Sequence, residues 1–107
     1  MKDRLGPGSE LPTLFIGKWT VQIMYALKKR SHRHGELRRR LGRISQRMLT
    51  RTLRNLTSAG LISRRVTHVR PVAVEYALTP LGRTFIVPLN SICRWARRHR
   101  LALKAIA

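Results

Sequence analysis

The sequence predicts a mainly helical α+β domain, in which helices flank a two-stranded hairpin and a long helix ends the chain. Three observations predict this class. Apolar residues recur at helical spacing in the first half, the spacing changes to a period of two between Ile62 and Leu78, and helical spacing returns after Thr79-Pro80. A chain of 107 residues with 43% hydrophobic side chains can bury one core. We therefore expect one folded domain over residues 11–107, after a flexible segment over residues 1–10.

The N-terminal part of this domain is predicted to be helical with one polar interruption. Residues Leu11–Leu27 place apolar side chains at helical spacing, and Gly17 is a point where this stretch can divide into two helices. Residues Lys28–Arg33 are polar and predict a loop. Two leucines four residues apart predict a short helix over Gly35–Leu41, which Gly42 ends.

The clearest helical pattern lies between Ser45 and Gly60. Ser45 is a favourable N-cap, because its hydroxyl can accept a hydrogen bond from an unpaired backbone N–H of the first turn. Leu49, Leu53 and Leu56 form an apolar stripe on one side. Gly60 stands where a left-handed C-terminal cap is expected. This segment is therefore predicted to be a helix with one buried side.

A hairpin is predicted next. Residues 62–67 and 73–78 both alternate with a period of two, and the five residues between them include His68 and Arg70 at a basic tip. Glu75 is expected to form a structural salt bridge with the Arg64–Arg65 region of the other strand, and not to be catalytic.

The last helix is predicted to begin at Thr79-Pro80, with threonine as the N-cap and proline at the first helical position. Its apolar stripe extends along the helix, which we expect to continue past Arg100. Pro88 should kink this helix, because proline lacks the backbone N–H of one helical hydrogen bond.

This order of elements is that of a winged helix-turn-helix, whose second helix enters the major groove while the hairpin, or wing, contacts the backbone or the minor groove. The outward side of the predicted Ser45–Ser58 helix carries residues that can contact base edges: Gln46, Arg47, Thr50 and Arg51. Phosphate and wing contacts are expected from Arg33, His34, Arg38, Ser45, Arg54, His68 and Arg70. A solvated surface is the alternative for these cations, but such surfaces usually mix signs and this helix has no acidic residue.

The composition excludes several classes of protein. Lys and Arg number 23 against 4 Asp and Glu, which gives a formal charge of +19 and favours polyanionic partners. Four scattered carboxylates cannot form a calcium site, and the histidines lack zinc-ligand spacing. No nucleophile–base pair or glycine-rich phosphate loop is present, so we expect neither an enzyme nor a cofactor. One cysteine, Cys93, excludes an internal disulfide.

The expected setting is the cytoplasm, because no stretch approaches a membrane span and the N-terminus does not resemble a signal peptide. Two other binding functions stay open at this point. A packaging protein that binds DNA or RNA without regard to sequence also fits the charge. A membrane-active cationic protein fits less well, because the chain has a patterned core and a hairpin.

Several motifs together resemble the HxlR family of bacterial winged-helix transcription regulators. They are Ile16–Thr20, Gly35–Arg39, Ile44–Thr50, Gly60–Ile62, Val74–Gly82 and Trp95-Ala96, and the match extends over roughly Leu11 to Ala96. The resemblance implies a homodimer joined through the N-terminal and C-terminal helices, and binding to inverted repeats in promoter DNA. The dimer stripe would then include Leu11, Leu14, Phe15, Leu81, Phe85, Leu89, Ile92, Cys93 and Ala96, some of which belong to the protomer core instead.

Two departures from the family pattern affect what can be carried over. The family usually has two glycines before the Lys18-Trp19 pair, whereas this chain has Gly17 alone. Many members have an oxidant-sensing cysteine near the N-terminus, and the corresponding region around Leu5-Gly6 has none. The redox switch is therefore not carried over. Cys93 is expected to pack near the dimer interface, and a thiol switch there would need an exposed thiol of low pKa.

Overall fold

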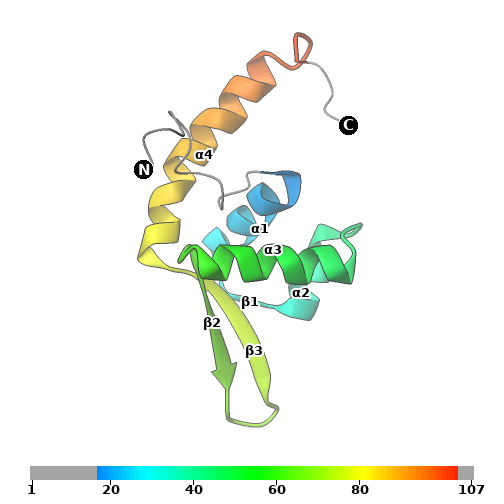
Figure 1. The fold of residues 1–107 in the computed structure, drawn as a ribbon, viewed down its shortest axis with the longest axis vertical. Coiled ribbons are helices and arrows are strands. Elements are labelled where there is room, and N and C mark those ends of the chain that lie inside the picture. The colour runs from blue at the N-terminus through cyan, green and yellow to red at the C-terminus, as the bar shows by residue number, and fades with distance from the viewer. Residues whose placement is uncertain (1–16, 104–107) are drawn as a thin grey trace, which may run out of the picture.

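The computed structural model describes residues 17–103. In this part of the chain the elements follow the order α1, β1, α2, α3, β2, β3, α4 (Figure 1). The helices are α1 (Lys18–Lys29), α2 (His34–Leu41), α3 (Gln46–Ser58) and α4 (Pro80–Arg98). The strands are β1 (His32–Arg33), β2 (Ile62–Thr67) and β3 (Ala73–Leu78). The fold is the expected winged helix-turn-helix, and its neighbours among known structures, described below, share it.

The helix bounds follow local signals in the sequence. Gly17 is the N-cap of α1, so residues 11–16 of the predicted first helix lie outside the described residues. Gly42 ends α2 and Gly60 follows α3, each with a positive φ, 77° and 82°, that glycine adopts without steric cost. The Thr79 side chain caps α4 by accepting a hydrogen bond from the Gly82 N–H at 3.0 Å. These four boundaries depend on residues within a turn of the helix end.

Two predicted boundaries are wrong. The expected loop over Lys28–Arg33 instead contains the last turn of α1 and the short strand β1, which pairs with β3 through His32 opposite Tyr76 and Arg33 opposite Glu75. A strand of two residues has no periodicity, so only its pairing reveals it. Helix α4 ends at Arg98 and does not continue past Arg100, because residues 99–103 form a turn closed by the backbone N–H groups of residues 102 and 103 on the His99 carbonyl.

The wing is part of a three-stranded antiparallel sheet in the order β1-β3-β2. Strands β2 and β3 pair along their length, from Ile62 opposite Leu78 to Thr67 opposite Ala73. The expected cross-strand ion pair is present, with Arg65 Nη2 3.7 Å from Glu75 Oε1. Strand β1 joins the base of the hairpin to the body, and Figure 1 shows the hairpin projecting away from the helices.

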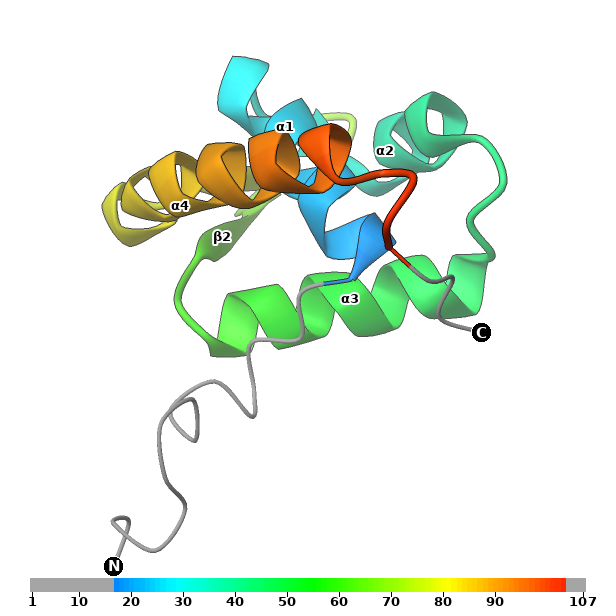
Figure 2. The same ribbon diagram turned by 90° about the horizontal axis from the view of Figure 1, so that it is seen from above.

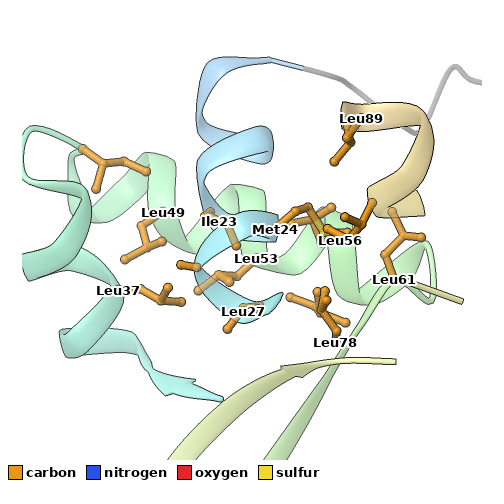
Figure 3. Close-up of a cluster of buried hydrophobic side chains, with 14 residues drawn as sticks. Ile23, Met24, Leu27, Leu37, Leu49, Leu53, Leu56, Leu61, Leu78 and Leu89 are labelled. Carbon is orange, nitrogen blue, oxygen red and sulfur yellow. The ribbon is translucent and has the colours of Figure 1, made fainter. Parts of the chain in front are cut away.

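One hydrophobic core holds these elements together. Figure 3 shows side chains from α1, α2, α3, the strands and α4 converging on it. Ile23, Met24, Leu37, Leu49 and Leu89 have no exposed surface. Burial of a side chain of this size contributes roughly 1.5–3 kcal/mol. The core fixes α3 against α1, and leaves the other side of α3 at the surface of the molecule, as Figure 2 shows.

Candidate nucleic-acid interface

Helix α3 is held at its start and along one side. At its start, Ser45 Oγ accepts a hydrogen bond from the Met48 N–H at 3.0 Å, as its expected N-cap role requires. Along its buried side, Leu49 and Leu53 are at most 1% exposed, with Leu56 close to them. The helix therefore cannot roll without removing leucines from the core, so its outward side is fixed relative to the body.

The outward side of α3 brings together the residues expected to contact DNA. Gln46, Arg47, Thr50, Arg51 and Arg54 are all exposed, as the sequence pattern predicts. No acidic residue lies on α3, so no carboxylate of this helix competes for its arginines. The first turn adds the positive end of the helix dipole. The arrangement can donate several hydrogen bonds to an anionic or acceptor-rich surface.

Two side chains of α2 contact this face, and sequence reasoning missed the contact. Arg38 Nη1 donates to Gln46 Oε1 at 3.3 Å, and His34 Nε2 lies 3.3 Å from Thr50 Oγ1. Arginine has only donors, so the Gln46 carbonyl must be the acceptor and its amide NH₂ is left to face outward. The residue pairs are 8 and 16 positions apart, so no local spacing reveals them.

The remaining α2 candidate, Arg33, is exposed at the start of α2. Its backbone N–H donates to Glu36 Oε1 at 2.8 Å, and Arg30 Nη1 lies 3.6 Å from the same carboxylate oxygen. The backbone hydrogen bond, assisted by the Arg30 charge, lowers the pKa of Glu36 below its usual value. Glu36 thus caps α2, while the side chain of Arg33 extends into solvent.

The wing presents His68 and Arg70 at its exposed tip, as expected. Two apolar neighbours that the sequence analysis did not single out are exposed beside them, Val69 at 74% and Val72 at 67%. Their position is unusual for valine, which is normally buried. In Figure 1 the tip lies well beyond the body, so the hairpin can contact a partner at a place that α3 does not reach.

The predicted dimer stripe divides into core and surface. Leu89 has no exposed surface and Phe85 is half-buried against the core, so the expectation that Leu89 faces a partner is corrected: it packs inside its own protomer. Ile92 is 46% exposed, and Cys93 and Ala96 are half-buried. Leu11, Leu14 and Phe15 lie outside the described residues.

Leu81 of the predicted stripe is 55% exposed, and outside the stripe Trp95 is 49% exposed, with its ring stacked on His99.

Cys93 lies at the contact between α1 and α4. The Tyr25 hydroxyl donates a hydrogen bond to Asn90 Oδ1 and lies 3.9 Å from Cys93 Sγ. Burial, followed by the hydrogen bond to Cys93, raises the pKa of Tyr25 above its usual value. The thiol is thus engaged in packing between two helices.

Within residues 17–103 no group of three potential ligands could hold a metal ion, and no helix is long and apolar enough to cross a bilayer.

Comparison with known proteins gives consistent matches over most of the chain. A family model described as HxlR-like helix-turn-helix matches residues 14–103. An uncharacterised HTH-type transcriptional regulator of Methanothermobacter thermautotrophicus is 45% identical over 83 residues, which are 78% of this chain and 63% of that relative. The chain thus spans less than two-thirds of that relative's length.

Solved structures agree. A transcriptional regulator of the MarR family from Enterococcus faecalis has a TM-score of 0.75 and 34% identity, with 95% of this chain and 92% of that chain covered. The redox regulator HypR in its reduced form has a TM-score of 0.73 and 36% identity, with 85% and 89% covered.

Proposed function

The chain belongs to the HxlR-like helix-turn-helix family and is a transcriptional regulator with a winged-helix fold, and from this we propose that it binds inverted-repeat promoter DNA as a homodimer. Its relatives and fold neighbours are regulators and not enzymes. The observation that carries the proposal is the exposed, acid-free side of α3, held in place by the leucines on the opposite side. We place the protein in the cytoplasm, on the nucleoid.

In this proposal α3 lies in the major groove. Gln46, Arg47, Thr50 and Arg51 contact base edges, and arginine is the side chain best suited to the two acceptors of guanine. Phosphate contacts come from Arg33, Arg38, Ser45 and Arg54, with His34 beside them. His68 and Arg70 extend the contact at the wing, and the exposed valines of the tip offer apolar surface to the sugars of the minor groove.

The homodimer would use the exposed apolar surface of α4. Of the predicted interface residues on this helix, Leu81 is 55% exposed and Ile92 is 46% exposed, and Trp95 enlarges the surface. Large apolar side chains that stay exposed in a protomer are typical of a protein–protein contact. A two-fold dimer places the two α3 helices about 34–36 Å apart, one turn of DNA.

A second function, packaging of nucleic acid without regard to sequence, is favoured by the charge of +19. The two functions differ in their dependence on sequence. Selection of binding sites from random duplexes should recover an inverted repeat for the regulator, and recovery of no common sequence would favour packaging.

A matched pair of variants tests the assignment of α3. Arg47→Ala should lower the affinity for the selected repeat by roughly 1–3 kcal/mol and relax the preference at one base pair. Arg54→Ala, a phosphate contact on the same helix, should weaken selected and random duplexes by similar factors. Both are measured by competition binding at fixed salt. Equal losses on both duplexes for Arg47→Ala would remove Arg47 from the base-contacting set.

A further inference from the structure

Three arginines gather at the C-terminal end of α4, away from the surface described above. Arg94, Arg97 and Arg98 are all exposed and line a surface hollow of about 360 Å³. We call these three residues the arginine face of α4. In Figure 1 this end of α4 and the tip of the wing lie at opposite ends of the molecule. The arginine face is therefore not part of the wing contact.

The arginine face is also separate from the apolar surface proposed for the dimer. Successive residues of a helix are rotated by about 100°, so the three arginines lie within an arc of roughly 100°. By the same geometry Ile92 and Ala96 lie about 150–170° from the centre of that arc, and Trp95, at the edge of the apolar surface, lies about 110° from it. A second protomer packed on Ile92 would therefore leave the arginines open.

Nothing in the described part of the chain neutralises these cations. Within it, Arg94 donates to Ser91 Oγ at 3.4 Å, and none of the three arginines forms an ion pair. The two carboxylates of the described residues, Glu36 and Glu75, pair with other arginines. Like charges three or four residues apart on a helix repel each other, and this repulsion opposes the favourable interaction of Arg97 and Arg98 with the helix dipole in the last turn. Helix stability therefore does not account for the cluster.

A second copy of the chain cannot supply the missing negative charge. Each copy has 4 acidic residues against 23 basic ones. Even if Asp3 and Glu10, which lie outside the described residues, both paired here, three arginines would outnumber them. Apart from the mobile ions of the solvent, the cluster therefore suits a partner that is itself rich in anions.

We propose that the arginine face of α4 is a second phosphate-binding surface, which takes the backbone of duplex DNA outside the stretch contacted by α3 and the wing. The guanidinium fork suits a phosphate, and an open row of arginines suits a chain of phosphates. When α3 already holds a DNA molecule, the flanking part of that molecule is at high effective concentration near the arginine face. The identity of the polyanion as DNA rests on the proposed function, whereas the need for an external polyanion rests on the charges alone.

The test measures how affinity for a random-sequence duplex of 40 base pairs depends on salt. In the variant R94Q/R97Q/R98Q the slope of log affinity against log salt should fall by about 2–3 for each protomer, since each phosphate contact contributes about 0.9. The affinity should fall by roughly 10- to 100-fold at 100 mM salt. The control K18Q/K28Q/K29Q removes three exposed positive charges of α1 and should change the slope by less than 1.

A chemical readout locates the contact. DNA should protect Arg97 and Arg98 from an arginine-specific reagent such as phenylglyoxal and leave the exposed Arg83 reactive. The thermal midpoint of the triple glutamine variant should stay close to that of the wild type, because the relieved repulsion offsets the lost interaction of Arg97 and Arg98 with the helix dipole. If the thermal midpoint falls instead, the variant R94K/R97K/R98K replaces the glutamine variant. It keeps the charge but loses the guanidinium fork, and it should still weaken DNA binding by several-fold.

Two results would overturn the proposal. One is an equal loss of slope in both triple variants, which would mean that only net charge matters. The other concerns pyrophosphate, whose binding is measured by Trp95 fluorescence. If the wild type binds pyrophosphate saturably, and R94Q/R97Q/R98Q loses this binding but keeps the salt dependence of DNA binding, the occupant is a small anion. Random DNA is used throughout, so the absence of a selected inverted repeat would contradict the proposed function without affecting this result.

Discussion

At the scale of single residues, the hydrogen bond from Arg38 to Gln46 determines which groups of Gln46 would face a base in the proposed complex. A free glutamine can bond adenine with both its carbonyl and its NH₂ group, whereas Gln46 has its carbonyl already engaged at 3.3 Å. The NH₂ group that faces outward can only donate, so it suits acceptors such as guanine O6 and N7 or thymine O4. The neighbouring His34–Thr50 contact links the same two helices.

We expect Arg38→Met to shift base preference toward adenine at the position facing Gln46. Methionine removes the donor that holds the glutamine carbonyl toward α2, so the carbonyl can turn outward and accept from adenine. The binding free energy for a site with adenine at this position should become more favourable by about 1 kcal/mol. This is the lower end of the range for a good bidentate pair, because the contact is exposed. Competition among the four variants of the selected site measures it.

Arg39→Met is the control for this substitution. Arg39 is an exposed arginine of the same helix for which no contact with α3 is found among the described residues, so the preference should stay unchanged. An identical base profile for Arg38→Met and the wild type would contradict the orienting role of Arg38.

At the scale of elements, the first turn of α4 is fastened to the corner between α3 and β2. The Thr79 side chain donates to the Gly60 carbonyl at 2.6 Å, and its backbone N–H donates to the Leu61 carbonyl at 3.1 Å. Gly82 packs so tightly here that an added Cβ would lie 2.0 Å from the Leu61 carbonyl oxygen. The corner sets where α4 leaves the body and thus where its outer faces point.

We expect Gly82→Ala to destabilise the protein by roughly 1–3 kcal/mol, because the new methyl overlaps a backbone oxygen that cannot move alone. Gly35→Ala is the matched control. Gly35 lies within α2, and its added Cβ would meet only a flexible Arg39 side-chain nitrogen at 3.6 Å. Alanine should stabilise that helix by up to about 1 kcal/mol. Thermal unfolding of the two variants should give opposite shifts in Tm, and shifts of the same sign would contradict this account.

At the scale of the whole molecule, function depends on how the cationic and apolar surfaces are distributed. Positive charge lies on α3, on the wing and at the C-terminal end of α4, as well as on α1 and α2, and the core attaches these elements to one body. The exposed apolar side of α4 is the surface on which a second copy would pack. Dimerisation would double the number of phosphate contacts and set the spacing of half-sites.

We expect Ile92→Asp to separate the dimer without unfolding the protomer, because Ile92 is 46% exposed. An unpaired carboxylate in an apolar interface should weaken association by about 2–5 kcal/mol. Sedimentation velocity measures the mass, and affinity for an inverted repeat should fall more than affinity for a half-site.

Val87→Asp serves as the control, since Val87 is 67% exposed on a different side of α4 and should leave the mass unchanged. A dimer that survives Ile92→Asp would exclude this face as the interface.

The sequence alone determines the elements whose signals are local. Helix α3 could be predicted to within a residue, because its cap, its leucine stripe and its terminal glycine all lie inside the segment. The same holds for the two strands of the wing. Strand β1 could not be predicted, because its two residues are a strand only through pairing with β3.

The tertiary structure decided which surfaces are free and which side chains meet. It buried Leu89 in the protomer while leaving Ile92 exposed, although both belong to one apolar stripe. It also joined Arg38 to Gln46 across two helices. Periodicity gives the direction of a side chain from its own helix axis, but burial and contact depend on what packs against that axis, and only the assembled fold supplies this.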